Sequence, residues 1–150
     1  MCGLVGYIGS NQAAPILLEG LRRLEYRGYD SAGLAIHDGS DLKVIRAAGK
    51  ISALAQLVST ANPQGTFGIG HTRWATHGCP SENNAHPHQV NGLAVVHNGI
   101  IENYAELKAQ LIQEGRTFTS ETDTEVIAHL IDHELQTTPD LYQAVCQALS

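Results

Sequence analysis

Long apolar runs are missing from this chain of 150 residues. No stretch approaches the roughly 18 consecutive apolar residues of a membrane-spanning helix, and the first residues lack the basic and apolar regions of a secretory signal. Basic residues are also few: nine scattered lysines and arginines face fifteen acidic residues, which gives a net charge of −6. These absences argue against a membrane or a nucleic acid as partner, and they favour a cytoplasmic protein with a small or zwitterionic ligand.

Cysteine is scarce as well, because the chain has only Cys2, Cys79 and Cys146, which are widely spaced and odd in number. They make no disulfide framework, which fits a reducing compartment. Cys79, His86 and His88 form the one local cluster of metal-ligand types, but their spacing matches no zinc signature. We therefore expect no metal and no cofactor, while a zinc-binding domain around these three residues stays open as an alternative.

The residues that are present suit one folded domain with strands and helices interleaved. Apolar residues make up 43% of the chain and charged residues 16%, which is ordinary for a globular protein. The turn Asp-Gly-Ser-Asp at 38–41 predicts a hairpin between the second and third strands. The segment 78–91, which contains two prolines, predicts an ordered surface loop. Five short segments rich in Val, Ile, Leu and Gly predict strands, at residues 4–8, 32–37, 42–47, 67–71 and 93–98.

Helical spacing of apolar residues predicts four helices. The first has its apolar positions at residues 14, 17, 18, 21 and 24 and stops near Gly28. Asn103 with Glu106, and Thr122 with Glu125, predict capping boxes that open two more helices. A fourth begins at residue 139, and its apolar positions at 141, 145, 146 and 149 run to the last residues without a stop signal. We therefore expect the chain to end inside a larger domain.

The second residue is the most informative position in the chain. If the initiator methionine is removed, Cys2 carries a thiol and a free α-amine on one Cα. Unperturbed groups of these kinds titrate near about 8.5 and 7.7 to 8.0, so moving the proton from sulfur to nitrogen costs only about 1 kcal/mol. An N-terminal cysteine can use its own amine as the base, directly or through one water. The position predicts a nucleophile, although a cysteine at the start of an ordinary strand would look the same.

The segment 71–78, His-Thr-Arg-Trp-Ala-Thr-His-Gly, concentrates reactive side chains where a predicted strand enters a loop. The planar fork of Arg73 matches the two oxygens of a carboxylate, while pairing to an acidic side chain of the protein is the structural alternative. The segment 97–99, His-Asn-Gly, follows an apolar run. Asn98 and the Gly99 N–H can form an oxyanion hole, although Asn-Gly is also a common tight-turn dipeptide.

Two further segments supply polar groups. Residues 120–125 place three carboxylates in the predicted first turn of a helix, where the macrodipole favours them. Asp123, whose side chain is short, is the candidate to accept hydrogen bonds from a substrate ammonium group. Residues 26–33 predict a turn whose glycines allow close backbone approach and whose polar residues support the site from behind.

Together these motifs resemble one known family over almost the whole chain. Single motifs are shared with amidophosphoribosyltransferases and asparagine synthetases. The distinguishing combination is the segment 71–78 together with residues 25–33, Glu-Tyr-Arg-Gly-Tyr-Asp-Ser-Ala-Gly. This combination is similar to the class II glutamine amidotransferase domain of the glutamine-fructose-6-phosphate aminotransferase family, also called the glucosamine-6-phosphate synthases. Met-Cys-Gly at the start, His-Asn-Gly at 97–99 and residues 120–126 add to the match. The resemblance implies an α+β fold of the N-terminal nucleophile type, a four-layer αββα sandwich of antiparallel sheets.

The resemblance also implies roles for individual residues. Cys2 would attack the side-chain amide of L-glutamine, and water would hydrolyse the resulting thioester to glutamate. Asn98 and the Gly99 N–H would stabilise the oxyanion. Arg73 would hold the substrate α-carboxylate and Asp123 its α-ammonium group. The pocket or its lid would be lined by Trp74, Thr76 and His77.

Compared with that family the chain is short. It ends at Ser150, inside the family's glutaminase domain, and it lacks the two sugar-isomerase domains in which ammonia would convert fructose 6-phosphate to glucosamine 6-phosphate. We therefore expect residues 1–150 to be a glutaminase domain truncated at its C-terminus, with at most glutaminase activity, whereas the complete enzyme would be a homo-oligomer. A catalytically silent glutamine-binding module and the glutaminase domain of another class II amidotransferase are the alternatives.

Overall fold

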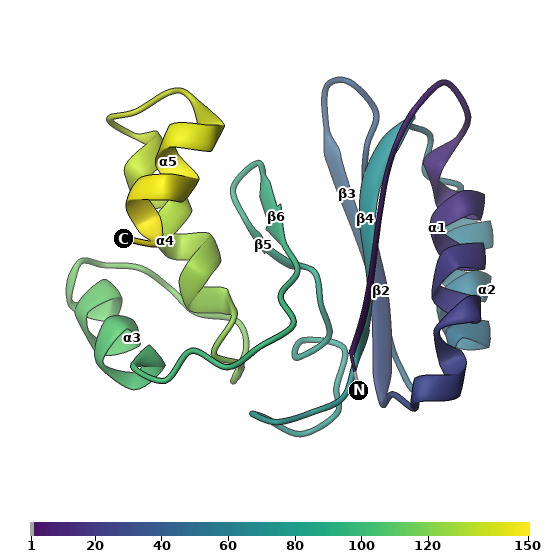
Figure 1. Cartoon of the computed structure of the whole chain (residues 1–150), viewed down its shortest axis with the longest axis horizontal. Coiled ribbons are helices and arrows are strands. Elements are labelled where there is room, and N and C mark those ends of the chain that lie inside the picture. Colours follow the sequence, from purple (N-terminus) through teal and green to yellow (C-terminus); the bar gives the residue numbers. More distant parts are fainter. Residues whose placement is uncertain (1) are drawn as a thin grey trace.

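Four antiparallel strands form the main sheet of the computed structural model, which describes residues 2–150. In space the strands follow the order β1–β4–β2–β3 (Figure 1). Their bounds are Gly3–Ile8 for β1, Ser31–His37 for β2, Leu42–Ala48 for β3 and Phe67–Arg73 for β4. The predicted hairpin of β2 and β3 is confirmed. Its turn is closed by Asp38, whose Oδ1 accepts the N–H groups of Ser40 and Asp41 at 2.8 and 2.7 Å.

Two helices, α1 (Ala13–Arg23) and α2 (Ile51–Ala61), cover one face of this sheet (Figure 1). The apolar stripe predicted on the first helix is buried, because Leu17 and Leu21 have no exposed surface. Burial of each such side chain stabilises the fold by about 1.5 to 3 kcal/mol. Leu17 and Leu21 belong to the larger hydrophobic core, which lies between the main sheet and its two helices. The helix ends five residues before Gly28, since a short 3-10 turn separates the two.

The second helix, α2, is not among the elements expected from the sequence. Its buried residues Ile51, Leu54 and Val58 do recur at helical spacing. The signal was therefore present in the sequence. It is weak because alanine, serine and threonine fill most of the remaining positions.

Alternation of side chains along the strands decides which residues face α1. A Cβ added to Gly68 or to Gly70 of β4 would lie 3.2 Å from a leucine side chain of α1, so the even-numbered residues of β4 face the helices. The odd-numbered His71 and Arg73 therefore point to the opposite face. Gly3 pairs with Thr72 and also lies against the helix side, so the preceding Cys2 shares the face of His71 and Arg73.

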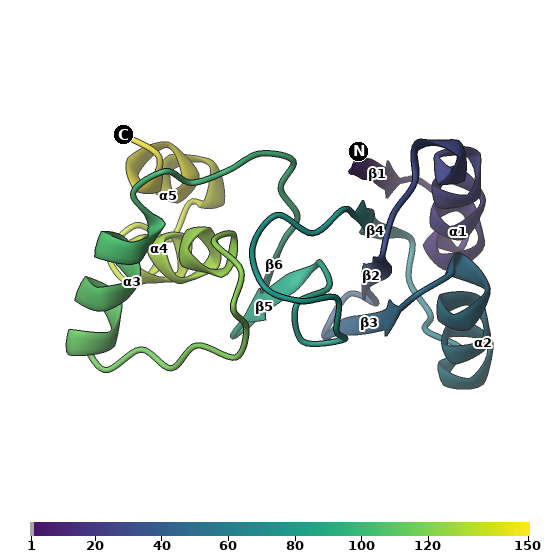
Figure 2. The same ribbon diagram turned by 90° about the horizontal axis from the view of Figure 1, so that it is seen from below.

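A short hairpin and three helices lie on this opposite face (Figure 1, and from below in Figure 2). The bounds are His88–Val90 for β5, Leu93–Val95 for β6, Tyr104–Gln113 for α3, Glu125–Leu135 for α4 and Leu141–Ala148 for α5. A second, smaller core joins α4 and α5 through Ile127, Ile131 and Ala144. The layers follow the order helices, main sheet, hairpin, helices, which is the α+β arrangement that was predicted.

The prediction of a surface loop at residues 78–91 is confirmed for residues 78–83 and wrong for residues 84–90. Asn84, Ala85 and His86 are buried, and residues 88–90 form β5. The cause lies at Gly33 of the main sheet, where an added Cβ would be 2.2 Å from the carbonyl oxygen of His86. The segment packs directly on the sheet because this strand position has no side chain.

The strand predicted at 93–98 is too long, since β6 ends at Val95. The segment 97–99 therefore lies in a loop and not at the end of a strand. The predicted capping boxes are also wrong. Neither Asn103 nor the residue before α4 makes a side-chain cap hydrogen bond.

Residues 120–124 precede α4 instead of forming its first turn, so that prediction is wrong too. The Glu125 carboxylate accepts the backbone N–H groups of Thr119 and Ser120 at 2.8 and 2.7 Å. Burial by itself would raise the pKa of Glu125, but His129 and these hydrogen bonds outweigh it and lower that pKa. A buried carboxylate thus folds the segment before α4 back onto the helix.

The last helix, α5, begins close to the predicted start. Asp140 caps it by accepting the N–H of Gln143 at 2.9 Å. Its buried residue is Ala144, while Leu141, Cys146 and Leu149 are exposed. Within residues 2–150, no helix has the length and apolar character needed to cross a membrane.

Candidate active site

Cys2 lies at the end of β1, beside the last residues of β4. Gly3 donates its N–H to Thr72 Oγ1 at 3.1 Å, which fixes the chain next to Cys2. The Cys2 sulfur accepts the backbone N–H of Trp74 at 3.2 Å. The strand pairing therefore brings the thiol to the beginning of the segment 73–78.

An outer cavity of about 550 Å³ opens in front of the Cys2 sulfur. Asn98 Nδ2 lies 3.5 Å from the carbonyl oxygen of Cys2, so the two residues meet although 96 positions separate them. The predicted nucleophile, Cys2, and the predicted oxyanion donors, Asn98 and Gly99, therefore line the same cavity. The cavity is lined by Cys2, Arg27, Trp74, Thr76, Asn98, Gly99 and Ile100.

A second, inner cavity of about 20 Å³ is also lined by Cys2. Besides Cys2 it is lined by Arg73, His97, Thr122 and Asp123, among others. Arg73 and Asp123 are both 4% exposed. Two opposite charges are therefore buried within reach of Cys2, as a zwitterionic ligand requires.

Arg73 has most of its hydrogen bonds inside its own loop. Its Nη2 donates to the carbonyl oxygens of His77 and, at 3.2 Å, of Gly78. Its Nη1 is buried and has no hydrogen-bond partner among the described residues, although Asp30 Oδ1 lies 3.9 Å away. Nη1 therefore has an ion pair with Asp30 but no hydrogen bond, so it can still donate to a ligand oxygen.

Asp123 is also tied to the protein. Its Oδ2 accepts the backbone N–H of Ile101 at 2.7 Å. Because Ile101 follows the segment 98–100 directly, this bond anchors the loop that carries Asn98 and Gly99. Asp123 thus has a structural role in addition to the binding role predicted for it.

The remaining predicted pocket residues differ in their placement. Trp74 is 54% exposed and lies over Gly28, where an added Cβ would be 2.6 Å from the indole ring. Thr76 lines both cavities. The ring of His77 packs edge-on against Tyr104 at a centroid distance of 5.0 Å, and this side chain is not among those that line either cavity.

The predicted turn at 26–33 is too long, since residues 31–33 already belong to β2. Its polar residues do contact the segment 73–78. Asp30 donates its N–H to the carbonyl oxygen of Arg73 at 2.8 Å, and its carboxylate accepts the N–H of Ala75 and the hydroxyl of Ser31. These contacts fix the backbone on both sides of Trp74.

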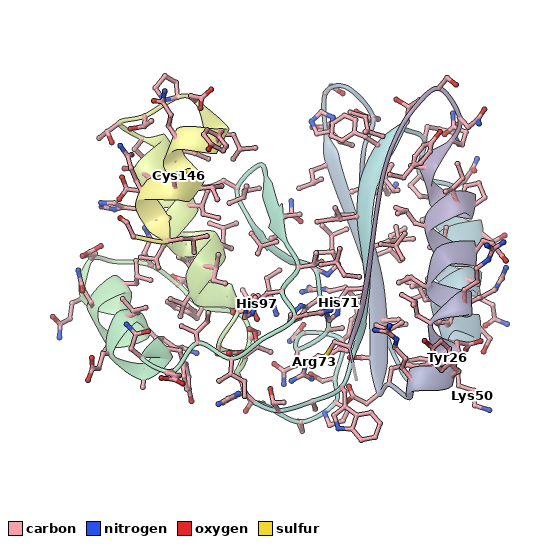
Figure 3. All side chains as sticks on the ribbon, viewed as in Figure 1. Tyr26, Lys50, His71, Arg73, His97 and Cys146 are labelled. Carbon is pink, nitrogen blue, oxygen red and sulfur yellow. The ribbon has the colours of Figure 1, made fainter. Side chains whose placement is uncertain are left out.

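Buried histidines are the part of the site that was not predicted. His71, His86 and His88 form a column: the first two rings stack at 4.3 Å, and the last two meet edge-on at 4.7 Å. His71 points from β4 towards the loop of His97, between the sheet and α4 (Figure 3). The alternation along β4 could have placed His71 on the face of Arg73, but the stacking depends on the unexpected burial of segment 78–91.

The zinc alternative finds no geometric support. No group of three His, Cys, Asp or Glu side chains in residues 2–150 has an arrangement that could hold a metal ion. Cys79 is exposed and its sulfur lies 3.9 Å from Glu121 Oε2, whereas His86 and His88 are buried.

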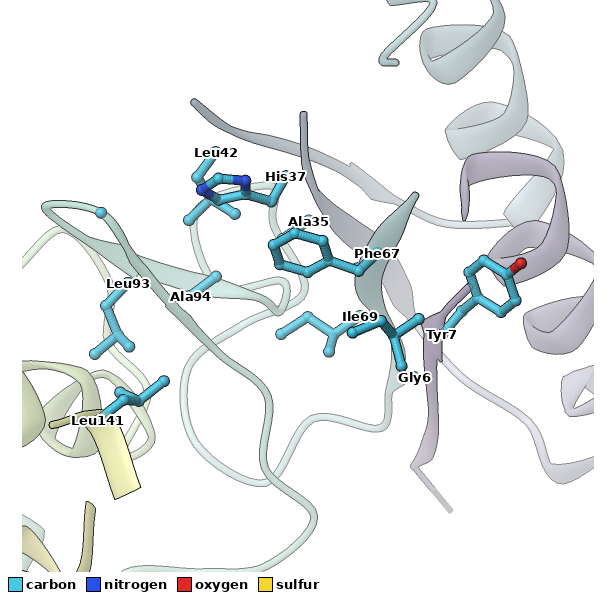
Figure 4. A pocket seen from close by; sticks show the side chains of 13 residues that line it. Gly6, Tyr7, Ala35, His37, Leu42, Phe67, Ile69, Leu93, Ala94 and Leu141 are labelled. Carbon is cyan, nitrogen blue, oxygen red and sulfur yellow. The ribbon is translucent and has the colours of Figure 1, made fainter. Parts of the chain in front are cut away.

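Another cavity, of about 580 Å³, separates the main sheet from the β5–β6 hairpin (Figure 4). Its wall is mostly apolar and includes Phe67, Ile69, Leu93 and Leu141. His37 is the one titratable side chain in it besides Tyr7. This cavity has no nucleophile and no paired charges, so the chemistry of the molecule gathers around Cys2.

Comparison with known proteins agrees with this geometry. A family described as "Glutamine amidotransferase domain" matches residues 71–145. Glutamine–fructose-6-phosphate aminotransferase (isomerizing) of Thermus thermophilus is 56% identical over 151 residues, which cover 99% of this chain and 25% of that protein. The protein of the same name from Caldanaerobacter subterraneus is 61% identical over 135 residues, covering 89% and 22%. The chain thus spans about a quarter of the length of these curated relatives.

Solved structures give the same result for the fold. Glutamine phosphoribosylpyrophosphate amidotransferase from B. subtilis, complexed with ADP and GMP, superposes with a TM-score of 0.83 at 33% identity, covering 99% of this chain and 32% of that one. A structure described as the allosteric regulatory enzyme of purine biosynthesis has the same TM-score at 34% identity and the same coverage. The shared fold is the N-terminal nucleophile fold that was predicted.

Proposed function

Because the chain belongs to the family of glutamine amidotransferase domains, we propose that it hydrolyses L-glutamine to glutamate and ammonia with Cys2 as the nucleophile. The observation that carries the proposal is the position of Cys2 between two sets of groups. Cys2 faces the outer cavity beside Asn98 and Gly99, and it also lines the inner cavity with the buried, oppositely charged Arg73 and Asp123. These residue types suit a ligand with an amide at one end and a zwitterionic amino-acid group at the other. The inner cavity of about 20 Å³ has to widen to admit the amino-acid end.

In the proposed reaction the Cys2 sulfur attacks the side-chain amide carbon of glutamine. The α-amine of Cys2 takes the thiol proton and delivers it to the departing nitrogen as the C–N bond breaks. Ammonia leaves, and a thioester remains. Water then adds to the thioester carbon, and the C–S bond breaks to give glutamate and the free thiol. In both halves the Asn98 amide and the Gly99 N–H stabilise the negative oxygen.

The buried charges bind the other end of the substrate. The unpartnered Nη1 of Arg73 supports a contact with the α-carboxylate, because a buried nitrogen without a hydrogen bond is unfavourable and a bound oxygen would relieve it. Asp123 receives the α-ammonium group. Trp74 and Thr76, which line both cavities, form the pocket wall, while His77, which packs against Tyr104, would belong to the lid.

We also propose that this chain is part of the glutaminase domain of a longer, cytoplasmic and homo-oligomeric enzyme. In that enzyme the ammonia would pass to sugar-isomerase domains and convert fructose 6-phosphate to glucosamine 6-phosphate. Support comes from the names of the curated relatives and from their length, of which this chain spans about a quarter. No cofactor takes part in the proposed reaction.

The test is glutamate release from glutamine by the wild-type protein and two matched cysteine variants. Cys2→Ala should abolish release, while Cys146→Ala, which changes an exposed cysteine on α5, should leave it unchanged. Asn98→Ala should lower kcat by about 10² to 10³. Activity that survives Cys2→Ala would refute the proposal, and calorimetric binding of glutamine without turnover would favour a silent binding module.

A further inference from the structure

His71 contacts the amide that the proposed reaction uses. This histidine has no exposed surface, and its Nε2 lies 2.7 Å from Asn98 Oδ1. Asn98 itself is an exposed residue of the loop that follows β6. The contact therefore joins a buried residue of the main sheet to an exposed loop at the Cys2 cavity.

The surroundings of Asn98 fix the direction of this hydrogen bond. The other end of the Asn98 amide faces the carbonyl oxygen of Cys2 at 3.5 Å, and a carbonyl oxygen can only accept. The NH₂ group must therefore be on the Cys2 side, so Oδ1 faces His71. It follows that His71 donates its Nε2–H, which assigns the tautomer of a neutral ring.

Burial keeps that ring neutral at physiological pH. Desolvation lowers the pKa of His71 to about 4, against the opposing effects of the hydrogen bond to Asn98 and, after it, of the backbone of His97. A neutral imidazole has a single N–H, and in His71 this N–H donates to Asn98 Oδ1.

The ring of His71 is also held from behind. It stacks on His86, whose carbonyl oxygen packs on Gly33 of the sheet. His88 contacts the far side of His86 and lies 2.8 Å from Thr122 Oγ1 through its Nε2. This packing leaves His71 little freedom to turn, so the donor stays aimed at the Asn98 loop.

We propose that His71 is a positioning residue, which holds the Asn98 amide with its NH₂ group towards Cys2. The inference rests on the proposed function, because only there does Asn98 stabilise an oxyanion. Without the His71 donor the amide can rotate about its last bond and present an oxygen to the developing negative charge. Turnover would then fall while binding of the amino-acid end of glutamine stayed the same.

Two amide variants make a matched pair for the kinetic test. Glutamine at position 71 can place an NH₂ group where Nε2 of the histidine lies, whereas asparagine reaches only as far as Nδ1. We expect His71→Asn to lower kcat by about 10-fold with little change in KM, and His71→Gln to restore most of kcat. Equal losses in the two variants would overturn the inference.

A double-variant cycle separates positioning from packing. If His71 acts through Asn98, His71→Asn should have no further effect on kcat in an Asn98→Ala background. The same fold-loss in both backgrounds would show that His71 acts elsewhere and would overturn the inference. Unchanged kcat in Asn98→Ala alone would instead remove Asn98 from the proposed function, and the role of His71 with it.

One measurement needs neither a variant nor turnover. The ¹⁵N chemical shifts of the His71 ring in the wild-type protein should report a proton on Nε2 and none on Nδ1 at pH 7. A ring protonated on Nδ1 would overturn the inference even if His71→Asn failed to fold. Wild-type protein that folds with the Nε2–H tautomer but releases no glutamate would refute the proposed function and leave the His71–Asn98 hydrogen bond in place.

Discussion

Lowering the pH from 7 to 5 should destabilise this protein through its buried histidines. Burial lowers the pKa of His71 to about 4 and that of His88 to about 4, well below the value near 6.5 of an exposed imidazole. The pKa of His86 is lowered by burial as well. Because the unfolded chain binds more protons than the folded chain between these values, stability is lost as the pH falls through about 6.5 and towards 4.

The size of the effect follows from proton linkage. A group with pKa values of about 6.5 unfolded and 4 folded loses roughly 2 kcal/mol of folding free energy between pH 7 and pH 5. His71 and His88 together should therefore remove about 4 kcal/mol, and His86 adds to the loss in the same direction. The loss is a large part of the total free energy of unfolding of a typical domain, which is about 5 to 15 kcal/mol. Glu125, whose pKa is lowered, loses its contribution only at still lower pH.

The assay is urea unfolding at pH 7 and pH 5, followed by circular dichroism. His88→Gln should show a pH-dependent loss about 2 kcal/mol smaller than the wild type. His133→Gln, which changes an exposed histidine of α4, serves as the matched control and should keep the wild-type loss. Identical losses in the wild type and in His88→Gln would show that protonation of the buried His88 does not destabilise the fold.

Three further predictions concern single positions. Asp123→Asn should raise the KM for glutamine by about 10- to 100-fold, because a charged hydrogen bond to the substrate is lost; steady-state kinetics with an unaltered KM would leave Asp123 only its contact with the Asn98 loop. Gly33→Ala should lower the free energy of unfolding in urea by about 1 to 3 kcal/mol, because the added Cβ would lie 2.2 Å from the His86 carbonyl oxygen. The control Gly6→Ala should be nearly neutral, because nothing lies near the added Cβ there. Glu125→Gln should cost about 3 kcal/mol by the same assay, since an NH₂ group would face the donors of the segment before α4; a neutral result would contradict that account.

The main sheet could be predicted because its signals are local. The strands are short apolar segments separated by turns, and the Asp38 turn carries its own hydrogen-bond acceptors. The same alternation puts Cys2 and Arg73 on one face of the sheet. The two predicted halves of the site, the thiol and the Asn98 loop, then meet through the fold.

The segments that were wrongly predicted depend on contacts between distant residues. Prolines and polar residues make 78–91 look like a surface loop, but the absence of a side chain at Gly33 lets His86 pack on the sheet. Thr122 and Glu125 have the spacing of a capping box, yet the hydroxyl bonds to His88 and the carboxylate to the backbone of the preceding segment. No local pattern reports these partners, and the histidine column could not be predicted without them.

Glutamate release by two preparations that differ only at the N-terminus shows whether the reaction needs the free α-amine of Cys2. Met1 lies outside the described residues, so its removal has to be measured, by intact mass before and after treatment with methionine aminopeptidase. Protein that starts with Cys2 should convert glutamine to equal amounts of glutamate and ammonia. Protein that keeps Met1 should be inactive, because the Cys2 nitrogen is then an amide with no basic lone pair. Equal turnover by the two forms would contradict the claim that Cys2 uses its own amine as the base.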